Sequence, residues 1–217
     1  MREPFHMELD RLGGEVAEMC ELVAQALERA THSLIEVDLS LAEQVISDDV
    51  EIDARRAECE AHAFQVLALQ APVARDLRVV VSTIYAADKV ERMGDLARHV
   101  ADVARRRHPR PVVPEELLYR FAEMGRLGAQ AARELGRVVL NPTTPRSEAM
   151  DRADDRTDEL ERELLAALTS HDCDYDVRTA VDVALLARFY ERFSDQAVSV
   201  MRRIDFIVTG EQVHGSP

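Results

Sequence analysis

The amino-acid sequence repeats itself once along its length. The stretch AEMCELVAQA at 17–26 aligns with AEMGRLGAQA at 122–131, at an offset of 105 residues. Further along, ERMGDLA at 91–97 aligns with ERFSDQA at 191–197, where the offset of 100 fits a connection shorter by five residues. A proline-rich stretch, RHPRPVVPEE at 107–116, lies at the seam and is typical of a linker. Two copies predict a pair of similar units, because an extended solenoid needs more repeats.

Both copies carry the hydrophobic spacing of α-helices. Apolar residues recur three and four positions apart, as in the series Met19, Leu22, Val23, Ala26, Leu27, Ala30 and Leu34. The spacing predicts six helices, at roughly 5–36, 40–70, 74–106, 114–139, 146–170 and 176–208. We therefore expect an all-α fold of two pseudo-symmetric three-helix bundles, one formed by residues 1–108 and the other by residues 109–217.

The charge balance limits the partners. The 217 residues include 41 acidic and 27 basic residues, for a formal net charge of −14. This argues against nucleic acid, because phosphate binding needs clustered Lys and Arg. The basic run RRRHPR at 105–110 is expected at a helix C-terminus, where cations are favoured. Apolar stretches of about 18 residues, an apolar signal region and CxxC pairs are all missing from the sequence, so we expect a cytoplasmic protein that reaches membranes only through partners.

Three carboxylates of the first copy share one helical stripe. Asp88, Glu91 and Asp95 are spaced i, i+3 and i+7, and Asp49 and Asp53 form an i, i+4 pair on the preceding predicted helix. In an antiparallel bundle the early part of the second helix passes the later part of the third, so the two acidic sets would face each other. Carboxylates gathered in one groove repel one another unless a cation lies among them. The sequence therefore predicts a metal site.

The second copy repeats this arrangement with Asp154 and Asp158 on one predicted helix and Glu191 and Asp195 on the next. Oxygen donors favour hard or borderline cations, so the candidates are iron, Mn²⁺, Mg²⁺ or Zn²⁺, and several neighbouring carboxylates allow a multinuclear cluster. The simpler alternative is a solvated acidic face on each helix, in which ion pairs between neighbouring turns neutralise part of the charge.

Signatures of catalysis are missing from the sequence. It contains no GxxxxGK[ST] loop, and no Glu-x-x-His pair lies within the acidic motifs. We therefore expect that the chain is not an enzyme, and we assign it no catalytic residue. Two other classes stay open: a metal-storage protein or carboxylate-bridged metalloenzyme, and a structural helical module whose acidic grooves bind basic surfaces of partners.

Two stretches are specific enough to point to a family. LALQAPVARDLR at 67–78 and DKVERMGDLA at 88–97 match the motifs L-x-L-Q-x-P-V-A-x-D-L-R and D-x-x-E-R-[IM]-G-D-x-A, and the second copy retains ARFYERFSD at 187–195. The chain therefore resembles the PhoU family, regulators that accompany bacterial phosphate-specific ABC transporters. The resemblance implies two three-helix bundles that hold down the phosphate-starvation response when phosphate is plentiful. It also implies contacts with the transporter's ATPase subunit and with the sensor histidine kinase of a two-component system, and we expect a homodimer.

The resemblance further implies metal clusters held by paired [ED]-x-x-x-D motifs. The implied ligands are Asp49, Asp53, Glu91 and Asp95, with Asp88 as a neighbour, and in the second half Asp154, Asp158, Glu191 and Asp195. The second half departs from the family pattern, because Arg188 stands at the position equivalent to Asp88 and Phe193-Ser194-Asp195 replaces I-G-D. A fixed positive charge beside the second site repels a cation, so we expect that site to be weaker or empty.

Overall fold

Six long helices make up most of the computed structural model, which describes residues 2–141, 148–171 and 174–209. They are α1 (Arg2–Glu36), α2 (Leu39–Gln70), α3 (Ala74–Arg107), α4 (Leu118–Leu140), α5 (Glu148–Leu168) and α6 (Val177–Thr209), with a single 3-10 turn, η1 (Glu115–Leu117), before α4. The part of the chain so described contains no strand. The prediction of six helices is confirmed, although the predicted fourth helix starts with η1 and the expected start of the fifth, at 146, lies outside the described residues.

Local chemistry explains where the helices of the first half begin and end. The side chain of Asp38 caps α2 by accepting a hydrogen bond of 3.0 Å from the backbone N–H of Leu41. The same helix ends at Ala71, whose left-handed φ of 42° is followed by Pro72, which cannot continue a helix. The last turn of α3 carries Arg105, Arg106 and Arg107, so the predicted position of the basic run is confirmed.

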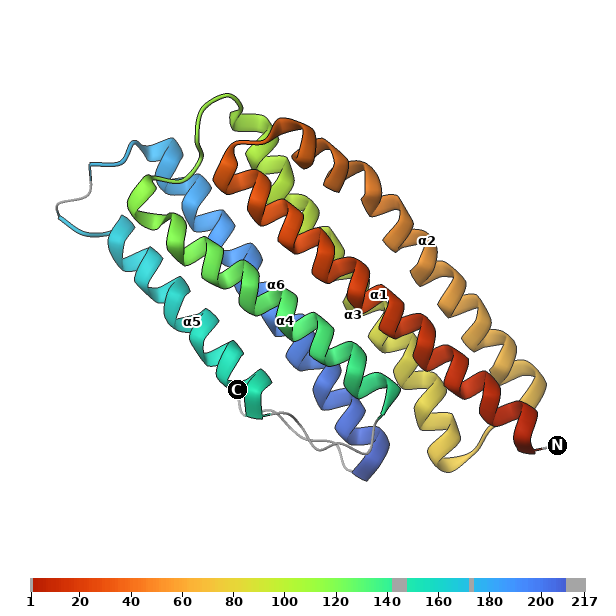
Figure 1. Ribbon diagram of the computed structural model, residues 1–217. Helices are drawn as coiled ribbons and strands as arrows, with labels where there is room; N and C mark the ends of the chain where they lie inside the picture. The colour runs from red at the N-terminus through yellow and green to blue at the C-terminus, as the bar shows by residue number, and fades with distance from the viewer. Residues whose placement is uncertain (1, 142–147, 172–173, 210–217) are drawn as a thin grey trace.

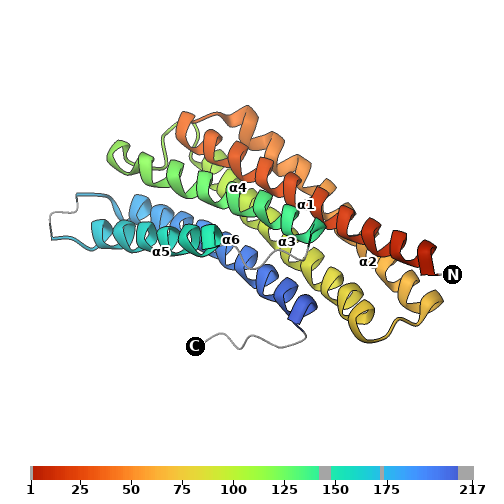
Figure 2. The same cartoon turned by 60° about the horizontal axis from the view of Figure 1, so that its bottom comes forward.

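The two halves lie side by side, with two helices on the outside. In Figures 1 and 2, α1 packs against α4 and α3 packs against α6, while α2 packs mainly against helices of the first half and α5 mainly against helices of the second. Facing pairs such as Tyr85 with Ser199 and Arg107 with Thr179 show that α3 and α6 are antiparallel. The two three-helix bundles predicted from the sequence are therefore present, and four inner helices join them.

At the interface between the two halves, α1 and α4 pack closely against each other. A Cβ placed on Gly128 would lie 2.6 Å from Leu27 Cδ2, so this position has no room for a larger residue. Nearby, the hydroxyls of Thr31 and Tyr190 share a hydrogen bond of 2.8 Å between the two halves. Packing of this kind excludes water and stabilises the pair by burying apolar surface.

One hydrophobic core runs through both halves. Its buried members come from all six helices, so the halves are not separate cores joined by a linker. The domain boundary that we set after residue 108 therefore stays a prediction. Cys20 and Cys59 are buried and unpaired, and Cys173 lies outside the described residues. Over the described ranges, no helix has both the length and the apolar character needed to cross a bilayer.

Candidate metal sites

The first acidic cluster, defined as Asp49, Asp53, Asp88, Glu91 and Asp95, lies where α2 passes α3. Its closest cross-helix link is an arginine. The Nε of Arg98 lies 2.7 Å from Asp49 Oδ2, and its Nη2 donates to Asp95 Oδ1 at 2.6 Å. The side chain of Arg98 thus joins a carboxylate of α2 to a carboxylate of α3. The structure brings the predicted partners together, and it places a protein cation between two of them.

A glycine lets the two helices come this close. A Cβ built on Gly94 of α3 would lie 2.9 Å from Ile52 Cδ1 and 3.5 Å from Asp49 Oδ1. The glycine of the E-R-M-G-D motif therefore has a steric role, because a side chain there would push α2 away from α3. Its equivalent in the second half is Ser194.

Burial and like charges perturb the first cluster. Desolvation raises the pKa of Asp49, and Arg98 opposes this rise while Asp95 and Asp53 add to it. The pKa of Glu91 is also raised, first by burial and then by the negative charges of Asp95 and Asp53. These four carboxylates are therefore close enough to repel one another, as the sequence predicted.

Asp88 lies at the edge of the first cluster. Arg92 Nε lies 3.2 Å from Asp88 Oδ2, and both side chains are at least half exposed. Asp88 contributes least among the named causes of the raised pKa of Glu91. An ion pair of the kind anticipated under the solvated-face alternative is thus present at Asp88.

The second acidic cluster, Asp154, Asp158, Glu191 and Asp195, occupies the equivalent place between α5 and α6. Burial raises the pKa of Asp154, while a hydrogen bond from the hydroxyl of Ser194 lowers it in part. Burial and then the charge of Asp195 raise the pKa of Asp158. The same two causes, in the same order, raise the pKa of Glu191 to about 7. The second cluster thus also brings like charges together in a poorly hydrated place.

Arg188 neutralises part of the second cluster. Its Nη1 lies 2.7 Å from Glu191 Oε2 and 3.9 Å from Glu161 Oε1. The first contact is an ion pair without hydrogen-bond geometry, so the buried Oε2 has no hydrogen-bond partner among the described residues. The positive charge expected beside this cluster is in place. Arg98 was not among the site residues predicted from the sequence, although its spacing three residues after Asp95 is an ion-pair spacing. Both clusters hold a protein cation, and the expected weakness of the second site stays a prediction.

The clusters are not ready coordination shells. Within the described residues, no group of three or more His, Cys, Asp or Glu side chains is arranged to hold a metal ion. The donor set still fits a hard cation in its chemistry, because every candidate ligand is a carboxylate. A cation entering the first cluster would compete with Arg98 for Asp49 and Asp95. Metal binding and the identity of the metal therefore stay predictions.

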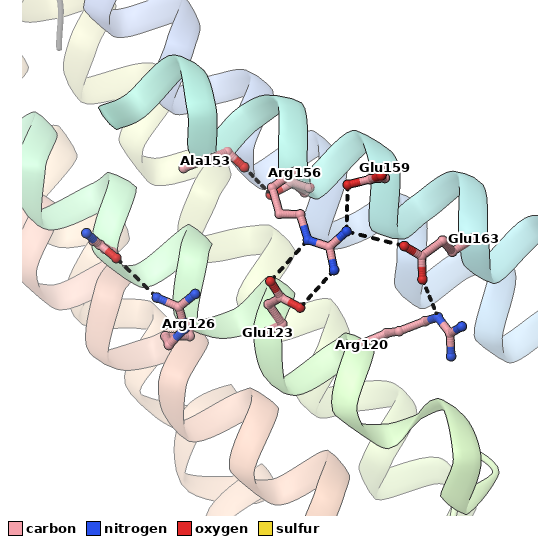
Figure 3. A network of polar contacts seen from close by, with 9 residues as sticks. Arg120, Glu123, Arg126, Ala153, Arg156, Glu159 and Glu163 are labelled. Atoms are coloured by element: carbon pink, nitrogen blue, oxygen red, sulfur yellow. Dashed lines mark hydrogen bonds and ion pairs between the residues drawn. The ribbon is translucent and has the colours of Figure 1, made fainter. Parts of the chain in front are cut away.

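Polar contacts on the other side of α5 hold that helix in position. In Figure 3, Arg156 of α5 reaches Glu123 of α4, with Nε 3.1 Å from Oε1, and also contacts Glu159 and Glu163 of its own helix. Arg120 of α4 donates from Nε to Glu163 at 3.0 Å. This network fixes α5 on α4 while its opposite edge presents the second cluster to α6.

In the first half, a histidine helps to hold α2 in position against α1. His62 of α2 lies with Nδ1 2.9 Å from Glu15 Oε1 and Nε2 2.8 Å from Glu8 Oε2, both on α1. Arg29 of α1 also pairs with Asp48 of α2 at 2.6 Å. The outer helix is thus fixed on α1 by the polar contacts of His62 and by one ion pair.

Comparison with known families decides the ancestry of the chain. The family model described as "PhoU domain" matches residues 16–104 and again residues 121–204, once in each half. The chain belongs to the PhoU family. It is 48% identical over 210 residues to the "phosphate-specific transport system accessory protein PhoU homolog 1" of Mycobacterium leprae, which covers 97% of this chain and 95% of that protein. It is 47% identical, over 97% of this chain and 99% of the relative, to PhoU homolog 2 of Mycobacterium tuberculosis strain H37Rv.

A solved structure of the PhoU family shares the fold. The crystal structure of the phosphate transport system regulatory protein PhoU from Streptococcus pneumoniae aligns with a TM-score of 0.84 at 22% identity, covering 97% of this chain and all of that one. This likeness bears on the fold alone. The all-α architecture of paired three-helix bundles, expected from the sequence, is confirmed.

Proposed function

We propose that this chain is a negative regulator of the phosphate-starvation response. It acts as a non-enzymatic adaptor in the cytoplasm that links the ATPase subunit of the phosphate ABC transporter to the sensor histidine kinase of a two-component system. The observation that carries the proposal is the near full-length similarity, at 47–48% identity, to proteins named as accessory proteins of phosphate-specific transport systems.

The shape of the molecule supports an adaptor. Its two halves share one core but present similar faces that differ in detail, such as Gly94 against Ser194 and Arg98 against Arg188. Two related faces on one shared core can contact two different partners at once. Regulation then needs no covalent chemistry on this chain, because a change in one contact alters the other through the shared core.

The experiment that tests the proposal is deletion of the gene in a strain that carries a phosphate-regulated reporter. Expression in phosphate-rich medium should become constitutive, and the wild-type gene supplied in trans should restore repression. Any second family member in the same genome is deleted as well, so that it cannot mask the effect. Continued repression in such a strain would rule out the regulatory role.

We further propose that the acidic clusters bind a divalent or trivalent metal ion. The supporting observation is the rise in pKa of Asp49, Glu91, Asp154, Asp158 and Glu191, because carboxylates crowded in this way gain from a cation among them. Asp49, Asp53, Glu91 and Asp95 would hold the ion in the first cluster. The ion would supply a positive charge that ties α2 to α3.

Elemental analysis of purified protein tests the metal proposal. The double variant Glu91→Ala with Asp95→Ala should lose metal, and so should Glu191→Ala with Asp195→Ala if the second cluster is also occupied. A matched control is Glu51→Ala with Glu58→Ala, which removes two exposed carboxylates from α2 outside the cluster. Equal metal content in the control and in the first double variant would reject the first cluster as the site.

A further inference from the structure

Three cations of the chain lie near aromatic rings where α3 packs against α6. Lys89 Nζ lies 5.5 Å from the centre of the Tyr85 ring, and Arg203 Cζ lies 5.4 Å from the same ring. Arg203 Cζ is also 5.0 Å from the Phe206 ring, and Arg78 Cζ is 5.9 Å from it. We call these five residues the ring-cation patch. Each distance is within the range at which a ring attracts a cation.

Within the described parts of the chain, the cations of the patch have no acidic partner. Among the described residues, Arg78, Lys89 and Arg203 form no ion pair, and the buried Nε atoms of Arg78 and Arg203 have no hydrogen-bond partner. This is unusual in a chain with a net charge of −14, where carboxylates are abundant. A guanidinium held near a ring can still donate hydrogen bonds from its terminal N–H groups to a carboxylate from outside. The rings also hold the cations in place, so less conformational entropy is lost on binding.

The opposite end of the same helix pair shows the contrast. There, Arg105 Nη2 lies 2.7 Å from Asp102 Oδ1, and Arg106 Nε lies 3.3 Å from Asp102 Oδ2. Arg107 Nε, which faces α6, lies 3.5 Å from Asp182 Oδ2. The arginines in the last turn of α3 thus have internal carboxylate partners, whereas those of the ring-cation patch do not.

An apolar stripe leads along α3 into the ring-cation patch. Leu77 and Val81 lie four residues apart on α3 and are 40% and 39% exposed, and Val73, the residue before the helix, is 74% exposed. The next position in the series is Tyr85, the ring under Lys89 and Arg203. Apolar side chains in line with free cations match a segment with leucine-like residues on one side and carboxylates beside them. The charge and the apolar character of this surface thus both match the same kind of occupant.

We propose that this stripe and the ring-cation patch form a docking surface for an acidic, amphipathic segment of a partner protein. Carboxylates of the segment pair with Arg78, Lys89 and Arg203, and its apolar side chains cover Leu77 and Val81. Nucleic acid is the wrong occupant, because three cations do not offset the repulsion between a polyanion and an acidic chain. The proposal deepens the proposed function and rests on it, since an adaptor needs a surface for its partner.

The first experiment uses the fact that Lys89 is the only lysine in the sequence. The probe is an N-acetylated, lysine-free peptide with glutamates and leucines at helical spacing, added to the full chain together with a carbodiimide. The carbodiimide activates a glutamate and leaves as the urea, while the nitrogen of Lys89 forms an amide and gives up a proton. Peptide mapping by mass spectrometry should place the amide at Lys89. An amide found mainly at the terminal amine would overturn the proposal.

The second measurement is the affinity for the same peptide by fluorescence anisotropy. Arg78→Glu with Arg203→Glu should weaken binding by about tenfold, whereas the matched pair Arg105→Glu with Arg106→Glu should change it by less than about twofold. Lys89→Arg should bind normally and lose the cross-link, and a peptide with glutamine in place of glutamate should bind weakly to every variant. Equal losses in the two reversed pairs, or unchanged binding of the glutamine peptide, would contradict a docking surface at the patch.

Two controls keep the test decisive. If circular dichroism shows that Arg78→Glu with Arg203→Glu is unfolded, Arg78→Gln with Arg203→Gln replaces it. This neutral pair should lose less affinity, and an unchanged affinity would contradict the proposal. Without peptide, carbodiimide treatment should leave the chain uncoupled. An amide between Lys89 of one copy and a carboxylate of a second copy would show that the surface binds itself, and would overturn the assignment to a partner protein.

The reporter strain separates this proposal from the proposed function. The Arg78→Glu and Arg203→Glu pair should raise expression in rich phosphate, while the Arg105→Glu and Arg106→Glu pair should remain repressing at equal protein levels. If gene deletion derepresses the reporter but the patch variant does not, the function stands and the docking surface fails. If deletion has no effect, the function fails, and the cross-link alone then decides whether the patch binds acidic segments.

Discussion

The two acidic clusters began as copies of one arrangement and are neutralised in different ways. In the first, Arg98 comes from α3 and reaches across to Asp49 of α2, so its charge holds two helices together. In the second, Arg188 pairs mainly with Glu191 of its own helix, and its contact with Glu161 of α5 is 3.9 Å long. The carboxylates are therefore common to both halves, whereas the arginine stands at a different position in each. In the first cluster the arginine links two helices, whereas in the second cluster the carboxylates still repel one another.

The same difference appears in the packing beside each cluster. Gly94 lets α2 approach α3 closely, while Ser194 is buried and uses its hydroxyl to hydrogen-bond Asp154. In the first half, the lack of a side chain at Gly94 allows close helix contact. In the second half, the side chain of Ser194 provides a hydrogen bond instead. Because the clusters differ in a few residues only, substitutions at those residues can test which features each half depends on.

The largest effect is expected from Gly94→Val, which should lower the free energy of unfolding by about 2–3 kcal/mol because the new side chain collides with Ile52. Urea denaturation monitored by circular dichroism measures it. Ser194→Val is the matched change in the second half and should cost less, since a Cβ already fits there. In the double variant with Ile52→Ala, the two losses should be smaller than their sum. Strictly additive losses would show that the close approach of α2 and α3 is not what Gly94 provides.

A smaller loss is expected from removing the cross-helix cation. Arg98→Met should cost about 1–2 kcal/mol at neutral pH, because Asp49, whose side chain is 12% exposed, is left beside Asp95 without a counter-charge. Arg188→Met should cost less than about 1 kcal/mol, because Arg188 is 55% exposed. Thermal unfolding of both variants, with and without added Mn²⁺, makes the comparison. A larger effect at Arg188 would reverse the roles assigned to the two arginines.

The smallest effect concerns the charge stored in the second cluster. Glu191 has a pKa of about 7 in the folded chain against an ordinary value of 4.5, so the folded state binds more protons between these pH values. The stability that protonated Glu191 contributes is therefore present at low pH and is lost as the pH rises through about 7. The free energy of unfolding should thus fall between pH 5 and pH 8. Glu191→Gln should flatten this slope by an amount on the order of 1 kcal/mol, measured as the urea midpoint at each pH. A slope that is unchanged in this variant would place the perturbed group elsewhere.

Most of the fold, and the gathering of the carboxylates in the candidate sites, could be predicted from the sequence. The hydrophobic spacing placed all six helices, and the offset repeats placed the acidic motifs on matching helices. The spacing of Asp49, Asp53, Glu91 and Asp95 also predicted that they would gather, and their mutual effects on pKa agree with this. Arg98 was missed, because a lone arginine three residues after an aspartate reads as a local pair, and its second partner lies on another helix.

The sequence by itself determined which residues form helices and which faces of those helices are apolar or acidic. These properties depend on neighbours three and four positions away, so they are written in the local order of residues. Only the tertiary structure decided that α3 lies antiparallel to α6, that Arg98 joins two helices, and that Lys89, Arg203 and Arg78 share two rings. Such pairings are set by how whole helices pack, since residues more than a hundred positions apart meet only when burial of the common core brings them together.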